Sequence, residues 1–184
     1  MDELVDILDP NGNYIGESTM KSEAHKHGLF HPTVHVWFYT KNNQILIQQR
    51  GENKAIHPLL WDVSVAGHVG AGEAIETSAL REVLEEIGLE IRKEQLQKIG
   101  VFKSIQKHSE TLIDCEFHHT FICKLHKPLN LLKKQDEEVE NLALIPLTKF
   151  AEETWGMANL KMYVPHDMEY YKTIIKAIKK SQLA

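Results

Sequence analysis

The 184-residue chain has two cysteines, no long apolar run and few basic clusters, and each shortage excludes a class of protein. Cys115 and Cys123 lie eight residues apart in one strand-like segment. Extended, that is about 26 Å, too far for a disulfide within the strand. No apolar stretch approaches the length of a membrane span, and the first residues, MDELVDILDP, do not have the pattern of a signal peptide. We therefore expect a protein of the reducing cytoplasm with no membrane partner.

Basic residues are outnumbered, with 21 Lys and Arg against 26 Asp and Glu, for a formal net charge of −5 at pH 7. No basic stripe precedes the C-terminal segment, so we do not expect a nucleic-acid partner. A small phosphorylated substrate needs only a local basic cluster and stays compatible with this composition. The hydrophobic fraction of 42% and the length predict one globular domain over residues 1–184.

Apolar periodicity predicts strands mixed with helices along the whole chain. Residues 1–30 contain a hairpin that turns at Asn11-Gly12, followed by a histidine-rich segment. Residues 165–183 have the spacing of a C-terminal amphipathic helix. Further strands are expected at 33–40, 45–49, 61–66, 99–107, 111–125 and 142–146. This order fits a mixed sheet between helices.

The segment GHVGAGEAIETSALREVLEEIGL (67–89) contains an unusual cluster of acidic residues. Glu82, Glu85 and Glu86 occupy positions i, i+3 and i+4 of the expected helix, so they project from one face within about one turn. Such close like charges repel each other, and the nearest cation is Arg81. A divalent cation that prefers oxygen ligands, such as Mg²⁺, would turn this repulsion into binding.

The flanks of this helix fit a ligand-binding role. Three glycines before Glu73 allow a tight loop that brings the backbone close to a ligand. Apolar residues between 79 and 87 form a stripe opposite the glutamates, and Gly88 stands where a helix would end in a left-handed cap. We expect a loop, a helix and a loop, with the carboxylates facing away from the core.

Residues 67–89 resemble the Nudix box. The match covers every position of its pattern: Gly67, Glu73, Arg81, Glu82, Val83, Glu85, Glu86, Gly88 and Leu89. The resemblance implies the Nudix fold, an α/β fold in which a mixed β-sheet lies in an α/β/α sandwich. It also implies hydrolysis of a diphosphate linkage in a nucleoside di- or triphosphate or a related metabolite, with Mg²⁺ or Mn²⁺ as cofactor.

The same resemblance assigns roles within the box. The metal ligands would be Glu82, Glu85, Glu86 and the carbonyl of Gly67. Arg81 would orient a glutamate, and Glu73 would brace the loop against the helix. The base would be Glu85 or Glu138, which lies in the acidic run 136–140; the alternative for that run is a solvated loop.

Outside the box, residues 3–146 resemble the isopentenyl-diphosphate isomerase branch of the superfamily. The likeness rests on KSEAHKHGLFH (21–31), QQRGENKAIHPLLWDVSVAGH (48–68) and LIDCEF (112–117). It implies that Lys21, Arg50 and Lys54 bind the diphosphate. It also implies a second divalent metal site, with these matching positions: His25 or His27, His31, His68, Asp114 and Glu116. Substrate contacts or plain structural roles are the alternatives for the histidines. His118, His119 and His126 are expected at the surface.

One departure separates the chain from the isomerases. The resemblance requires an acid–base cysteine where this chain has Ala66, and a methyl group cannot transfer a proton. Hydrolysis is therefore our prediction; isomerase activity and a catalytically idle binding module are the alternatives. The group beyond the diphosphate would be recognised by variable loops and by aromatics, for which core packing is the alternative: Trp37, Phe38, Trp155 and Tyr163.

Overall fold

A mixed seven-stranded sheet forms the centre of the computed structural model, which describes residues 2–155 and 160–183. The strand order is β5-β4-β3-β8-β7, with β6 paired to β3 and β9 paired to β4. β3 and β8 run parallel, and the other pairs are antiparallel. The strands are β3 (His31–Tyr39), β4 (Gln44–Arg50), β5 (Trp61–Asp62), β6 (Val65–His68), β7 (Gln97–Ser109), β8 (Leu112–Lys124) and β9 (Val139–Pro146).

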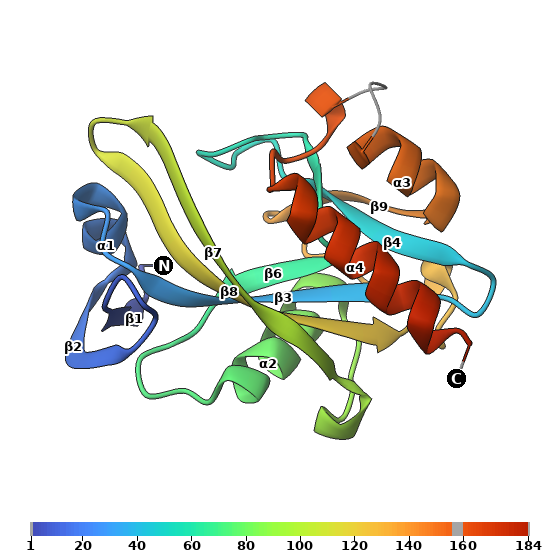
Figure 1. Cartoon of the computed structure of the whole chain (residues 1–184), viewed down its shortest axis with the longest axis horizontal. Helices are drawn as coiled ribbons and strands as arrows, with labels where there is room; N and C mark the ends of the chain where they lie inside the picture. Colours follow the sequence, from blue (N-terminus) through green and yellow to red (C-terminus); the bar gives the residue numbers. More distant parts are fainter. Residues whose placement is uncertain (1, 156–159, 184) are drawn as a thin grey trace.

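Helices cover both faces of this sheet (Figure 1). Every residue of β3 is buried, because this central strand is covered on both faces of the sheet. Trp37 and Tyr39 pack with α3 (Leu147–Trp155) and α4 (Met168–Ser181). Val36 and Phe38 pack on the other face with α2 (Ile75–Ile87). The predicted α/β/α sandwich is confirmed.

A second, two-stranded sheet lies at one end of the main sheet (Figure 1). It consists of β1 (Leu4–Leu8) and β2 (Tyr14–Met20), which turn through Gly12 at a φ of 88°, and α1 (Lys21–His27) follows directly. This unit contacts the glycine loop before α2: the amide of Ala71 donates to the Leu4 carbonyl at 2.9 Å. The N-terminal residues therefore help to position the loop of the box.

The box helix ends as expected. Gly88 caps α2 in the left-handed conformation, with a φ of 61°. Any residue with a side chain would be strained at this position. The first residue is Ile75, after Ala74, and no side chain caps this end. Three 3₁₀ segments complete the described elements: η1 (Lys93–Gln95), η2 (Leu129–Leu131) and η3 (Leu160–Met162).

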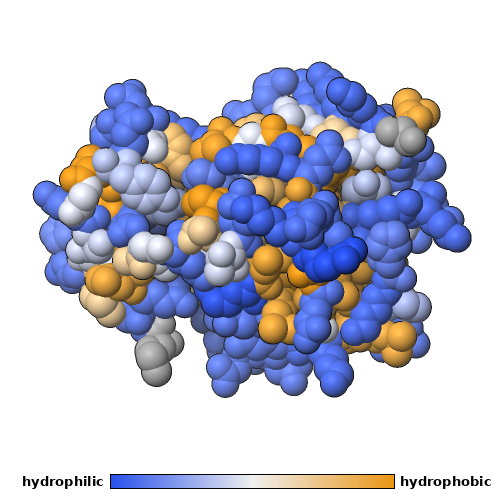
Figure 2. All heavy atoms as spheres, turned by 90° about the horizontal axis from the view of Figure 1, so that it is seen from below, coloured by the Kyte–Doolittle hydropathy of each residue, from blue (hydrophilic) through white to orange (hydrophobic). Residues whose placement is uncertain are grey.

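The outer surface offers no single large apolar face in the view from below, where hydrophilic residues predominate and apolar ones form separate groups (Figure 2). Within residues 2–155 and 160–183, each helix is too short or too polar to cross a membrane.

Candidate active site and metal centre

A cavity of about 550 Å³ collects most of the residues singled out from the sequence. The box, the N-terminal unit and the β4–β5 loop contribute to its walls, together with residues of strands β7 and β8. Its lining includes Gly67, Glu82, Glu85, Glu86, Lys21, Arg50, Lys54, Glu138, His25, His68, Asp114 and Glu116. Its size is that of a typical small-ligand pocket.

Gly67 and Glu82 are in close contact. A Cβ atom placed on Gly67 would overlap the carboxyl group of Glu82. The φ of Gly67 is not in the left-handed region, so space rather than backbone conformation requires a glycine here. Glu82 is buried, and burial raises the pKa of its carboxyl to about 7 against the opposing effect of Arg81. This carboxylate is therefore held against the backbone of β6.

Arg81 connects the loop, the helix and β6. Its guanidinium donates to Glu82 at 2.7 Å, to Glu85 at 3.1 Å and to Glu73 at 3.1 Å. It also donates to the backbone carbonyl of His68 at 3.0 Å. Glu73 in turn accepts from the amide of Gly70 at 3.2 Å. The geometry is that of a brace between loop and helix, in which Arg81 fixes three acidic side chains.

The three carboxylates line the cavity and not the apolar core, as expected, but the burial of two of them was not predicted. Glu82 and Glu86 are buried, at 8% and 4% exposure, and Glu85 is exposed. The reason is that β6 packs across this face of α2, with the amide of Ala66 donating to Glu86 at 3.2 Å. Burial and the nearby Glu82 raise the pKa of Glu86 to about 8. Two buried carboxyls side by side form a strong cation-binding environment.

Three cationic side chains line the same cavity as these carboxylates: Lys21, Arg50 and Lys54. Arg50 pairs with Asp62 at 3.1 Å, and Lys54 pairs with Glu138. Burial and the neighbouring Arg50 lower the pKa of Lys54. Lys21 pairs with Glu3 at 3.4 Å at the mouth. Glu138 thus lies at the cavity, where it neutralises a lysine.

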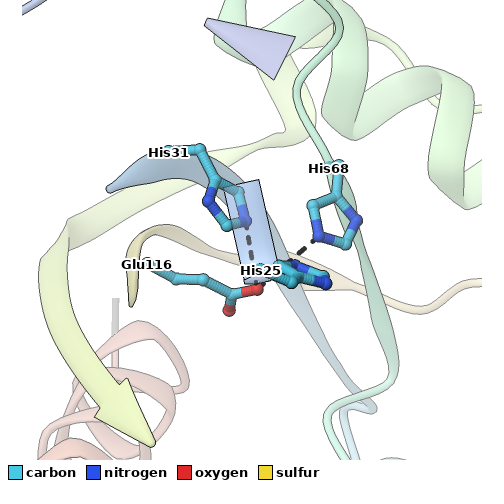
Figure 3. A group of neighbouring side chains, drawn as sticks. All are labelled: His25, His31, His68 and Glu116. Carbon is cyan, nitrogen blue, oxygen red and sulfur yellow. Dashed lines mark ion pairs between the residues drawn. The ribbon is translucent and has the colours of Figure 1, made fainter. Parts of the chain in front are cut away.

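Four side chains converge beside the box: His25, His31, His68 and Glu116 (Figure 3). One ligand atom from each lies within 4.8 Å of all the others. Glu116 is 3.6 Å from the Nε2 atoms of both His31 and His68. Asp114 lies next to this group, 3.8 Å from the Nε2 of His25. The alternative His27 is mostly exposed and bonds to Glu23 at 3.2 Å, so His25 is the member that the fold brings to the cluster.

The donor atoms of this cluster fit a metal ion. The Nε2 atoms of His25, His31 and His68 are buried and have no hydrogen-bond partner within the described chain. The Nδ1 of His31 lies 2.9 Å from the Leu29 carbonyl, to which it donates, and this leaves the Nε2 lone pair free toward the cluster. Three unpaired imidazole nitrogens around a carboxylate are costly without a cation and are ordinary metal ligands with one. Despite burial, His31 and His68 hold the pKa of Glu116 well below its usual range.

Three residues of the cavity lining were not predicted from the sequence as site residues. His118 was expected at the surface but is buried, because it follows Asp114 and Glu116 at the two-residue period of β8 and shares their face. That alternation was a usable signal. Asp62 and His166 form a 2.8 Å pair across 104 residues, which no local pattern reveals. His119 is half-buried, and His126 is exposed as expected.

The aromatic residues considered for substrate recognition do not belong to the cavity lining. Trp37 and Phe38 are fully buried in the two cores, and Tyr163 packs in the core with α3 and α4. Trp155 lies at the last position of α3. Core packing, the alternative interpretation, is correct for the first three.

Comparison with known proteins identifies the family of this chain. Nudix hydrolase 3 of Arabidopsis thaliana is 33% identical over 177 residues, which cover 93% of this chain and 23% of that protein. An uncharacterized Nudix hydrolase of Clostridium acetobutylicum is 30% identical over 203 residues, covering 96% and 97% of the two chains. These similarities define the class of the protein, which is that of hydrolases acting on pyrophosphate bonds. The NUDIX domain model matches residues 29–164, and the chain belongs to this family.

The isomerase branch is also represented among the relatives. Isopentenyl-diphosphate Delta-isomerase 2 of Photorhabdus laumondii is 31% identical over 144 residues, which cover 77% of this chain and 79% of that protein. A crystal structure from Deinococcus radiodurans has the same fold, with a TM-score of 0.72 at 17% identity, covering 92% of this chain and 98% of that one. The predicted relationship to the Nudix superfamily and its isomerase-like branch is confirmed.

Proposed function

We propose that this protein hydrolyses a diphosphate linkage in a small metabolite, a nucleoside di- or triphosphate or a related compound, with Mg²⁺ or Mn²⁺. One observation carries the proposal: the box carboxylates and the cationic side chains of Lys21, Arg50 and Lys54 line one cavity of about 550 Å³. A diphosphate ester needs both, because its oxygens bind cationic side chains while its metal needs carboxylates.

Each residue then has a distinct task. Glu82, Glu85, Glu86 and the carbonyl of Gly67 would hold the metal, which neutralises charge on the diphosphate and acidifies water. Arg81 keeps Glu82 and Glu85 in place through its hydrogen bonds. Lys21, Arg50 and Lys54 would bind the diphosphate oxygens. Glu85 and Glu138 are the two carboxylates that would accept the proton of the attacking water.

Turnover on a panel of diphosphate compounds tests this function. We expect phosphate or monophosphate release that requires Mg²⁺ or Mn²⁺ and falls at least about 100-fold in Glu86→Gln. Glu85→Gln and Glu138→Gln separate the two bases: loss of kcat at unchanged KM identifies the proton acceptor. Glu152→Gln, on α3, is the matched surface control. Full activity of Glu86→Gln would contradict the proposal.

Two other functions predict different results on the same panel. Isomerase activity predicts deuterium uptake into isopentenyl diphosphate without phosphate release. That reaction needs a proton-transferring group, and Ala66 supplies none. A binding module predicts tight retention of a diphosphate without turnover. The buried carboxylates beside Gly67 favour hydrolysis over both.

We further propose that His25, His31, His68 and Glu116, with Asp114 beside them, hold a second divalent metal. The unpaired Nε2 atoms support this assignment. Imidazole and carboxylate ligands together suit Mn²⁺, Fe²⁺ or Zn²⁺ more than Mg²⁺. Elemental analysis of the purified protein tests it: we expect about one bound metal ion that is lost in His31→Ala and retained in His27→Ala. An equal metal content in both variants would contradict the assignment.

A further inference from the structure

The cavity lining also contains a group of polar residues that hydrolysis of the diphosphate itself does not use. We call this group the inner subsite; its residues are Thr33, His35, Asp62, Ser104, His118 and His166. They come from β3, β5, β7, β8 and the segment before α4. A smaller adjoining cavity of about 310 Å³ shares Ser104, His118 and His166 with it. A subsite next to a diphosphate-binding wall is where the rest of such a substrate would lie.

The imidazole rings of the inner subsite are fixed against one another. His35 and His118 stack, with their ring centroids 4.1 Å apart and an interplanar angle of 17°. His166 meets His35 edge-on at 5.4 Å. The Nδ1 of His35 lies 2.6 Å from the hydroxyl of Tyr170, which also accepts from the indole of Trp37 at 2.9 Å. Ring faces are thus used for packing, and the ring edges are what a ligand would meet.

These edges carry polar atoms with unused capacity. Nδ1 of His118 lies 2.8 Å from the hydroxyl of Thr33, but its Nε2 is buried with no partner among the residues that the structure describes. His166 bonds to Asp62 at 2.8 Å, and Asp62 also accepts from Arg50 at 3.1 Å. Arg50 therefore joins the inner subsite to the cationic wall. A buried nitrogen without a partner costs free energy that a hydrogen-bonding ligand would recover.

An alkyl chain is a poor occupant of this subsite. It offers no hydrogen-bonding group to Thr33, His118 or His166, so buried polar groups would stay unpaired. A site made of hydrogen-bonding groups discriminates strongly against an analogue that lacks the matching groups. A flat, apolar-faced ring is also disfavoured, because the His35–His118 stack already covers one face of each imidazole.

On the basis of the proposed function, we infer that the inner subsite binds the group attached to the diphosphate, and that this group is hydroxylated and sugar-like rather than an alkyl chain. Its hydroxyls would pair with the edges of His118 and His166 and with the hydroxyls of Thr33 and Ser104. The specificity of the enzyme would then come from these side chains, while the box carries the hydrolysis.

Equilibrium binding tests this inference independently of turnover. The probes are two methylene-bridged diphosphonate monoesters, one with a ribosyl group and one with a pentyl group, and unesterified methylenediphosphonate. Each is titrated calorimetrically into the full chain with Mg²⁺. We expect the ribosyl ester to bind at least about tenfold tighter than the pentyl ester, the equivalent of one good hydrogen bond. His118→Phe should bring this ratio close to one and leave methylenediphosphonate binding unchanged.

A substitution at the buried His118 can destabilise the fold, so a second variant at a less buried position is measured as well. Ser104→Leu adds an apolar group at a half-buried position of the same subsite and should also abolish the preference for the ribosyl ester. Its matched control is the adjacent Ile105→Ala, a residue with 61% exposure on the other side of β7, which should keep the ratio. Equal binding of both esters by the unaltered protein would overturn the inference, as would an unchanged ratio in both variants. If methylenediphosphonate itself fails to bind with Mg²⁺, the proposed function fails and this inference falls with it.

Discussion

Replacing Gly67 by alanine tests the geometry of the site most directly. The added Cβ would overlap the carboxyl group of Glu82, which is buried and bonded to Arg81 at 2.7 Å, so it has little freedom to withdraw. Overpacking of this kind costs about 1–3 kcal/mol. For a chain of this size, the melting temperature should fall by about 2–10 °C. Displacing the Glu82 carboxylate, which we propose as a metal ligand, by about 1 Å should lower kcat about 100-fold.

Thermal melts and steady-state kinetics with Mg²⁺ measure both effects. Gly70→Ala in the same loop is the control, because its Cβ would meet only the Glu73 carboxylate, at 3.2 Å, and a side chain can adjust. A double-mutant cycle isolates the contact: in a Glu82→Ala background, Gly67→Ala should cost almost no stability. If the alanine is equally destabilising in that background, the contact with Glu82 is not the reason for the glycine.

Two further predictions concern pH. The raised folded-state pKa values, about 7 for Glu82 and about 8 for Glu86, mean that the metal-free protein should lose stability as the pH rises from the ordinary value of 4.5 to about 8. Added Mg²⁺ should restore it and bind more tightly at the upper end of this range, and Glu86→Gln should flatten both trends in melting temperature. Despite burial, His166 and Arg50 hold the pKa of Asp62 below its ordinary 3.8, so its contribution is present above that pH and is lost on further acidification. Acid-unfolding curves should therefore be less steep for Asp62→Asn than for the unaltered protein, and identical curves would contradict the ion pairs.

Local patterns were sufficient for most of the fold. The alternating hairpin, the box helix and the C-terminal amphipathic helix were predictable, because each has a hydrophobic period or a glycine with one structural purpose. The start of α2 was not, since Ala74 carries no capping side chain and the helix begins where the glycine loop ends. The short helix α1 within the histidine-rich segment was also missed, because seven residues give too little periodicity to distinguish a helix from a loop.

Most residues of the site could be predicted from the sequence, but the burial of its carboxylates could not. The charge pattern of the box predicted Glu82 and Glu86 as site residues. An isolated helix would expose both side chains to solvent. Only the packing of β6 on α2 buries them, and that contact joins segments that no local pattern connects. The same limit applies to Asp62 and His166, which meet through the path of the chain after β9. His118 differs, because its alternation with Asp114 and Glu116 was visible in the sequence.

Strand β6 connects the two metal sites that we propose. Gly67 touches Glu82 of the box, and the next residue, His68, belongs to the histidine cluster. Arg81 reinforces the link, because it donates to the His68 carbonyl at 3.0 Å while it holds Glu82. Any shift of this peptide therefore moves ligands of both sites together. A change that loosens the histidine cluster should consequently reach the box through β6 and Arg81.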